Sequence, residues 1–105
     1  MKQLVFYSTS SGKEPCRDWL NDLQLTEQAA IYAYIDRIAM GAAKKNIKPV
    51  GGGVFEIKID RGPGYRVYFG QIGQKIILLL LGGDKGSQNR DIRLAKDFWR
   101  DYETR

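Results

Sequence analysis

Histidine is absent from this chain of 105 residues, and cysteine occurs once, at Cys16. Without histidine the chain lacks the side chain that proteins use most often as a general base and as a zinc ligand. A single cysteine cannot form an internal disulfide, and a nucleophilic thiol would need a basic partner. We therefore expect Cys16 to be a small, half-buried helix residue, we expect no metal or other cofactor, and a reducing cytoplasm is the natural setting.

Long apolar runs are also missing. The longest, Ile76–Leu81, falls far short of the roughly 20 residues that a membrane span needs. The first residues, Met1–Leu4, lead directly into an alternating segment, so we expect no signal peptide and no membrane partner. A chain of this length predicts one domain, residues 1–105, with a core of its own.

Positive charge is in excess and unevenly placed. The formal net charge is +5, and residues 44–93 alone hold ten Lys/Arg against four Asp/Glu. Residues 1–43 come to −1, so the basicity belongs to the middle of the chain. A face that binds nucleic acid needs such an asymmetry, because phosphate contacts dominate that affinity. A solvated basic surface kept for solubility is the alternative.

The segment 53–93 predicts three strands. Apolar side chains alternate with charged ones from residue 55 to 60, which is the pattern of a strand with one buried face. Arg61–Gly64 has the proline and glycines of a turn, and residues 65–69 alternate again. The apolar run Ile76–Leu81 suits a central strand buried on both faces, and its flanking glycines and short length disfavour a buried helix.

The remaining segments predict one further strand and three helices. We expect a strand over Gln3–Ser8, a helix that follows Ser11 and ends near Gln24, a second helix from Thr26 to about Ala42, and a final helix over roughly Asn89–Glu103. Ser11 and Glu14 have the spacing of a capping box, Pro15 suits a first helical turn, and Thr26 is a good N-cap. Lys44–Val50 is expected to be a linker, which the flexible joint Gly51–Gly53 closes.

The predicted fold class is therefore α+β, in the order βααβββα. We expect a small, mixed and mostly antiparallel sheet, packed by an N-terminal helical hairpin and a C-terminal helix, with the first strand at an edge. If the strands after residue 53 pair antiparallel, one sheet face carries Glu56, Lys58, Arg66 and Tyr68. The loop Gly82–Arg90 then leaves the central strand beside them.

Polar side chains of this face and loop form the candidate site. Fixed cations can hold phosphates and stabilise the added charge of a pentacoordinate phosphorus. A base must then deprotonate a ribose 2′-hydroxyl, and Glu56, Tyr68 or a lysine of lowered pKa could serve. The constellation consists of Lys58, Arg66, Tyr68, Lys85, Gln88 and Arg90.

Several residues of this face also have a purely structural interpretation. Arg66 lies between core residues of a strand, where a salt bridge to Glu56 across the hairpin would account for it. Tyr68 could be an ordinary half-buried tyrosine of a sheet face. Glu56 and Asp60 could belong to a cross-strand charge network, because Lys58 stands between them.

The pattern from Phe55 to Ala95 resembles the RelE/ParE toxin superfamily, and within it the phage-derived, HigB-like killer proteins of addiction modules. It reads FEIKI, then GPGYRVYF, then IILLLLGGDKGSQNRDI and a following alanine, and the helix CRDWLNDL at Cys16–Leu23 fits as well. The resemblance implies a RelE-like fold and the toxin of a type II toxin–antitoxin system, usually a ribosome-dependent, metal-free mRNA endoribonuclease. It implies three partners: a cognate antitoxin of the helix-turn-helix type, the ribosome and mRNA.

The resemblance also implies residue roles. Lys58, Arg66 and Lys85, together with Arg90, match the basic positions that carry RNA binding and cleavage. From the residues themselves we expect Glu56 or Tyr68 to handle the proton, and Gln88 and Arg93 to join Lys58, Arg66 and Arg90 in RNA binding. Many ribonucleases of the superfamily carry an aromatic or histidine acid where this chain has Asp91 and Ile92. Two alternatives share the fold: an inhibitor of DNA gyrase, and an inactive phage relic that only binds an antitoxin.

Overall fold

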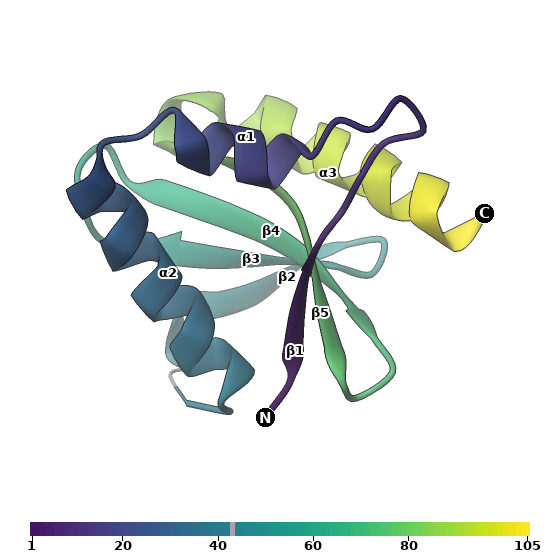
Figure 1. Ribbon diagram of the computed structural model, residues 1–105, viewed down its shortest axis with the longest axis horizontal. Coiled ribbons are helices and arrows are strands. Elements are labelled where there is room, and N and C mark those ends of the chain that lie inside the picture. The colour runs from purple at the N-terminus through teal and green to yellow at the C-terminus, as the bar shows by residue number, and fades with distance from the viewer. Residues whose placement is uncertain (43) are drawn as a thin grey trace.

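The computed structural model describes residues 1–42 and 44–105 (Figure 1). In these ranges the chain forms one strand, two helices, four strands and a last helix, with short 3₁₀ turns at Lys44–Asn46 (η1) and Lys85–Ser87 (η2). No helix of these two ranges is long and apolar enough to cross a membrane. The elements are β1 (Gln3–Phe6), α1 (Pro15–Asn21), α2 (Leu25–Ala39), β2 (Ile47–Gly51), β3 (Val54–Ile59), β4 (Tyr65–Ile72), β5 (Ile76–Gly83) and α3 (Gln88–Glu103).

The strands form one mixed sheet in the order β1-β5-β4-β3-β2. All neighbours are antiparallel except β1, which pairs parallel to β5 at one edge. The predicted α+β class and the edge position of the first strand are confirmed. Strand β5 is an interior strand and is buried on both faces as expected, because Leu79 packs on one side of the sheet and Leu80 on the other.

The prediction of a linker over 44–50 is wrong, because Ile47–Gly51 forms the edge strand β2 against β3. Pro49 is tolerated there, since an edge strand can leave one backbone position without a donor. A register shift between Pro49 and Gly51 follows it. Gly51–Gly53 all have positive φ (99°, 64° and 87°), a conformation that other residues avoid, so the glycine triplet is a tight hairpin turn rather than a loose joint.

The helix starts also differ from the prediction. Glu14 precedes α1 without a side-chain cap, so the capping box at Ser11 does not form, and Pro15 occupies the first turn as expected. Helix α2 begins at Leu25, one residue before the predicted N-cap Thr26. The capping box of this protein lies instead in η2, where the Asp84 carboxylate accepts a hydrogen bond from the Gly86 N–H at 2.8 Å. It fixes the loop that leads into α3.

The sheet has a helical layer on each face. Helices α1 and α2 cover one face and α3 the other, so that in Figure 1 the first two lie in front of the sheet and α3 behind it. On each face a tryptophan of the helical layer packs against a glycine of the sheet: Trp19 of α1 lies against Gly82, and Trp99 of α3 lies against Gly70. The predicted helical hairpin over one sheet face is thus confirmed. Three charged side chains of the described residues are buried, Glu56, Arg66 and Asp91, and all belong to the α3 side.

Candidate functional site

A groove of about 390 Å³ opens on the α3 side of the sheet, between the first turn of α3 and strands β2, β3 and β4. Four of its side chains are cationic and two are acidic. A concave surface with an excess of cations concentrates anions, because its low-dielectric walls focus the field. The groove is lined by Lys45, Asn46, Ile47, Lys48, Glu56, Lys58, Asp60, Arg66 and Gln88.

Arg66 is the unusual cation of the groove. It is 6% exposed, and its Nη1 donates a hydrogen bond to the Gly64 carbonyl, but its Nε has no hydrogen-bond partner. Within residues 1–42 and 44–105, no carboxylate forms an ion pair with it. Its neighbour on β3 is another cation, Lys58. A buried cation without a counter-ion is costly unless a ligand supplies the negative charge.

The interpretation of Arg66 as the salt-bridge partner of Glu56 is therefore wrong. The register of the hairpin decides this, because Glu56 lies opposite Tyr68 and Arg66 lies opposite Lys58. Lys58 itself is exposed, with its Nζ 3.8 Å from an oxygen of the exposed Asp60. The predicted common face of Glu56, Lys58, Arg66 and Tyr68 is confirmed.

Glu56 is a buried carboxylate held from two sides. It is 1% exposed, and its Oε2 accepts a hydrogen bond from Nε2 of Gln88 at 2.9 Å. Its Oε1 lies 3.8 Å from Nζ of Lys48, which faces it from β2. Helix α3 and strand β2 thus fix the carboxylate at the groove wall, with its oxygens toward donors, as a positioned proton acceptor requires.

Tyr68 lies beneath the groove rather than in it. Its side chain is fully buried, and within the described ranges its hydroxyl makes no hydrogen bond. Burial, followed by the nearby charge of Glu56, raises the pKa of Tyr68 far above its ordinary value of 10. The expectation of a half-buried ring is wrong. A ring with no exposed surface cannot stack on a base, so Tyr68 belongs to the core beneath the groove.

Lys85 lies outside the groove but close to Arg66. It belongs to η2 and lines a second hollow of about 230 Å³, to which Gln88 and Arg90 also contribute. Gly64 separates it from Arg66: a Cβ placed on Gly64 would lie 2.9 Å from Nη1 of Arg66 and 3.5 Å from Cβ of Lys85. The fold therefore brings Lys85 beside Arg66, although the two residues belong to different elements.

The other predicted RNA-binding residues differ in position. Gln88 lines both hollows and so connects them. Arg90 lines only the second, with its Nε 3.6 Å from an oxygen of the buried Asp91. Arg93 is exposed on α3 and lines neither hollow.

Lys45 and Lys48 line the groove but were not among the predicted site residues, because their segment was interpreted as a linker. Two signals in the sequence point to them. The basic run 44–48 directly precedes the charged strand, and Ile47 and Val50 are the half-buried residues of an edge strand. Within the described ranges, no group of three or more His, Cys, Asp or Glu could hold a metal ion.

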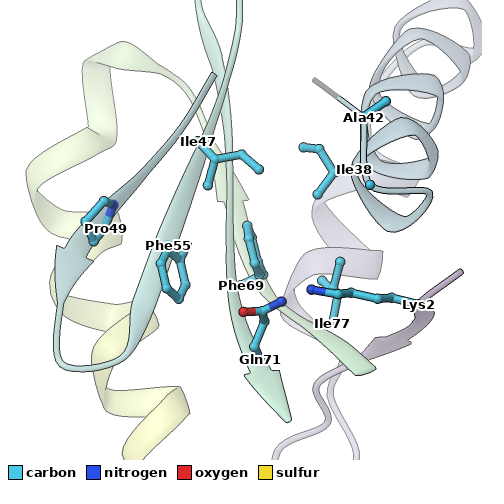
Figure 2. A pocket seen from close by; sticks show the side chains of 10 residues that line it. Lys2, Ile38, Ala42, Ile47, Pro49, Phe55, Phe69, Gln71 and Ile77 are labelled. Atoms are coloured by element: carbon cyan, nitrogen blue, oxygen red, sulfur yellow. The ribbon is translucent and has the colours of Figure 1, made fainter. Parts of the chain in front are cut away.

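A further pocket, of about 370 Å³, lies on the other face of the sheet and has a different character. Figure 2 shows Ile38 of α2 facing Phe69 and Ile47 of the sheet, with Phe55 and Pro49 farther along the wall. Among the described side chains that line it, Lys2 is the one that can ionise. These residues of the apolar pocket provide no acid–base pair, so the groove on the α3 side remains the candidate for chemistry.

Comparison with known proteins agrees with this architecture. Residues 18–99 match the family described as Phage derived protein Gp49-like (DUF891). An uncharacterized protein of Haemophilus influenzae is 44% identical over 79 residues, which cover 74% of this chain and 79% of that protein. A chain in the crystal structure of the intact E. coli RelBE toxin–antitoxin complex has a TM-score of 0.62 and 17% identity, over 80% of this chain and 96% of that chain. The structural likeness concerns the fold, whereas the family match includes every residue of the groove.

Proposed function

The chain belongs to the phage-derived Gp49-like family, a family of RelE/ParE-type toxins, and from this premise we propose that it is the toxin of a toxin–antitoxin pair. Its antitoxin would be a helix-turn-helix protein encoded beside it. The RelBE toxin–antitoxin complex, which contains a chain of the same fold, supports such a partner. We further propose that the toxin cleaves mRNA in the decoding site of the ribosome.

The observation that carries the cleavage proposal is Arg66. Its guanidinium is almost fully buried, faces Lys58 across the hairpin, and forms no ion pair within the described residues. Two cations that lie opposite each other at a buried site destabilise the folded protein. An anionic ligand that binds to both would explain why they are there. A phosphodiester is an anion of suitable geometry, because its two free oxygens match the fork of an arginine.

The neighbouring groups suit the cleavage of that phosphodiester. The 2′-oxygen of one nucleotide forms a bond to phosphorus, the bond from phosphorus to the next 5′-oxygen breaks, and a 2′,3′-cyclic phosphate remains. Glu56 takes the proton of the 2′-hydroxyl and later releases it to water, while the leaving 5′-oxygen is protonated from solvent. Lys58 and Arg66 hold the phosphate, and Lys85 stabilises the charge that grows in the transition state.

The proposal is tested by producing the chain without its antitoxin and mapping transcript 5′ ends across the cell. We expect growth arrest, with new 5′ ends inside translated codons. Replacing both Arg66 and Lys85 by Ala should abolish the new ends. A matched control replaces Lys13 and Lys75 by Ala, because both are exposed and lie outside the groove and the hollow beside it. That variant should cleave as the unaltered protein does.

Two results would contradict the proposal in different ways. Growth arrest with cleaved transcripts in the Arg66 and Lys85 double variant would refute these residue roles but not the activity. Arrest with intact transcripts and damaged DNA would refute the ribonuclease and favour an inhibitor of DNA gyrase.

A further inference from the structure

The groove continues past Arg66 toward the edge of the sheet, where two lysines form its outer wall. Lys45 extends from η1 and Lys48 from β2, and both side chains are exposed. We propose that these two lysines form a second phosphate position, which holds the phosphate next to the one held by Lys58 and Arg66. The inference deepens the proposed function and rests on it.

Strand register places the second position beside the first. Lys48 lies opposite Glu56 in the pairing of β2 with β3, while Lys58 follows Glu56 by two residues on the same face of β3. Glu56 is therefore adjacent to one member of each pair, Lys48 across the strands and Lys58 along β3, where the ribose that joins two phosphates of a bound strand would lie. This is also the position that the proposed proton acceptor needs.

The ion pairs of the groove leave both lysines available. Lys48 lies 3.8 Å from the Glu56 carboxylate, but its side chain is 64% exposed and Glu56 has its hydrogen bond from Gln88. Lys45 forms no ion pair within the described part of the chain. A weak exposed pair and an unpaired cation contribute little to folding. Their shared position on one groove wall is explained better by a ligand.

The size and charge of the groove favour one strand of RNA. A hollow of about 390 Å³ is the size of a small-molecule site, which a duplex cannot enter but a short single strand can. An exposed edge strand also leaves the path along β2 open to solvent. The ligand class is therefore the phosphodiester backbone of single-stranded RNA.

The experiment measures binding rather than cleavage. The probe is a fluorescent single-stranded oligoribonucleotide with 2′-O-methyl groups, which cannot be cut by its own 2′-oxygen. Fluorescence anisotropy over a series of salt concentrations gives the slope of log affinity against log salt. Each phosphate contact on a single strand contributes about 0.7 to that slope.

We expect Lys45→Gln and Lys48→Gln each to lower the slope by about 0.7 and the affinity at 0.1 M salt by roughly fivefold, and the double variant to lower the slope by about 1.4. Lys48→Arg keeps the charge and should restore the slope, which a role limited to packing would not predict. The double variant Lys13→Gln with Lys75→Gln removes the same charge outside the groove and should leave the slope unchanged. Circular dichroism verifies that all variants fold.

Three outcomes would overturn the inference. The wild-type protein could fail to bind the probe at any salt, or the Lys45 and Lys48 double variant could keep the wild-type slope. In a third outcome, the variants lose affinity only for poly-L-glutamate, a probe for an acidic protein partner.

If these lysines set the slope while cellular transcripts stay intact, the phosphate position stands and the proposed cleavage fails. If transcripts are cut while the Lys45 and Lys48 double variant keeps the wild-type slope, the proposed cleavage stands and the second phosphate position fails.

Discussion

The sheet face under α1 and α2 is filled with apolar side chains, whereas the face under α3 is apolar at one end and charged at the other. On the first face, Ile31 and Ile35 of α2 pack on Ile57 and Leu79 of the sheet, all fully or almost fully buried. On the second, Trp99 covers one end, and beyond the first turn of α3 lie the buried Glu56 and Arg66. The closed face follows the requirements of folding, and the open one keeps groups that folding alone disfavours.

The largest effect should come from opening a cavity in the closed face. Leu79 is 1% exposed at the centre of β5, so Leu79→Ala should lower the free energy of unfolding by about 2–5 kcal/mol. Leu94 is 38% exposed on α3, and Leu94→Ala serves as the control, with an expected change within about 0.5 kcal/mol. Urea unfolding measures both. Equal losses would mean that the two faces do not differ in packing as described.

The two glycine contacts test whether both helical layers lie equally close to the sheet. A Cβ on Gly82 would come 2.0 Å from the Trp19 ring, and one on Gly70 would come 2.2 Å from the Trp99 ring. Gly82→Ala and Gly70→Ala should each destabilise the protein by about 1–3 kcal/mol, because the core cannot absorb the added methyl group. Thermal unfolding provides the measurement. Combining Gly70→Ala with Trp99→Leu should recover part of the loss, and a neutral Gly70→Ala would place α3 farther from the sheet.

Replacing Arg66 should raise the free energy of unfolding, whereas the substitutions above lower it. Arg66→Met removes a buried cation that faces Lys58 and keeps the apolar length of the side chain, so we expect the free energy of unfolding to rise by about 1 kcal/mol. The same variant should lose RNA cleavage. Arg61→Met is the control, since Arg61 is exposed and pairs with Glu27 at 2.9 Å; it should give no gain. A clear loss of stability in Arg66→Met would show that Arg66 serves the fold.

The smallest effect is a pH dependence of the closed face. Burial raises the pKa of the Cys16 thiol from its ordinary 9.0 to about 12. The folded protein therefore keeps the proton in a range where the unfolded chain loses it, and stability is complete below pH 9 and falls as pH rises toward 12. Between pH 8 and 9.5 this group should lower the free energy of unfolding by roughly 0.8 kcal/mol. Urea unfolding at both pH values provides the measurement, and Cys16→Ala should not show this loss of free energy of unfolding. If the unaltered protein and Cys16→Ala depended on pH in the same way, the thiol would ionise without unfolding.

The strands β3, β4 and β5 could be predicted because each carries a local pattern. Alternation over residues 55–60 and 65–69 defines a half-buried strand, and the apolar run at Ile76–Leu81 defines a central one. Strand β2 could not be predicted in the same way. Its short length, its proline and the glycine triplet after it are typical of a loop, and only pairing with β3 makes Ile47–Gly51 a strand.

The candidate site also has features that could be predicted from the sequence and features that could not. The common face of Glu56, Lys58, Arg66 and Tyr68 follows from period two and an antiparallel hairpin, so it was predictable. The burial of Tyr68 was not, because it depends on how far α3 extends over the sheet. The lack of a counter-ion for Arg66 depends on the exact register that pairs it with Lys58, and a shift of two residues would have brought an acidic neighbour.

Composition and local period are sufficient to specify the fold class, the basic middle segment and the residue types available for chemistry. The groove, in contrast, forms only when the elements pack together. Their packing sets β2 beside β3, brings Lys45 and Lys48 to the wall, orients Gln88 toward Glu56 and places Lys85 next to Arg66. The physical reason is that such contacts join elements distant in the chain, and burial and register, which no local pattern specifies, arise only when those elements pack.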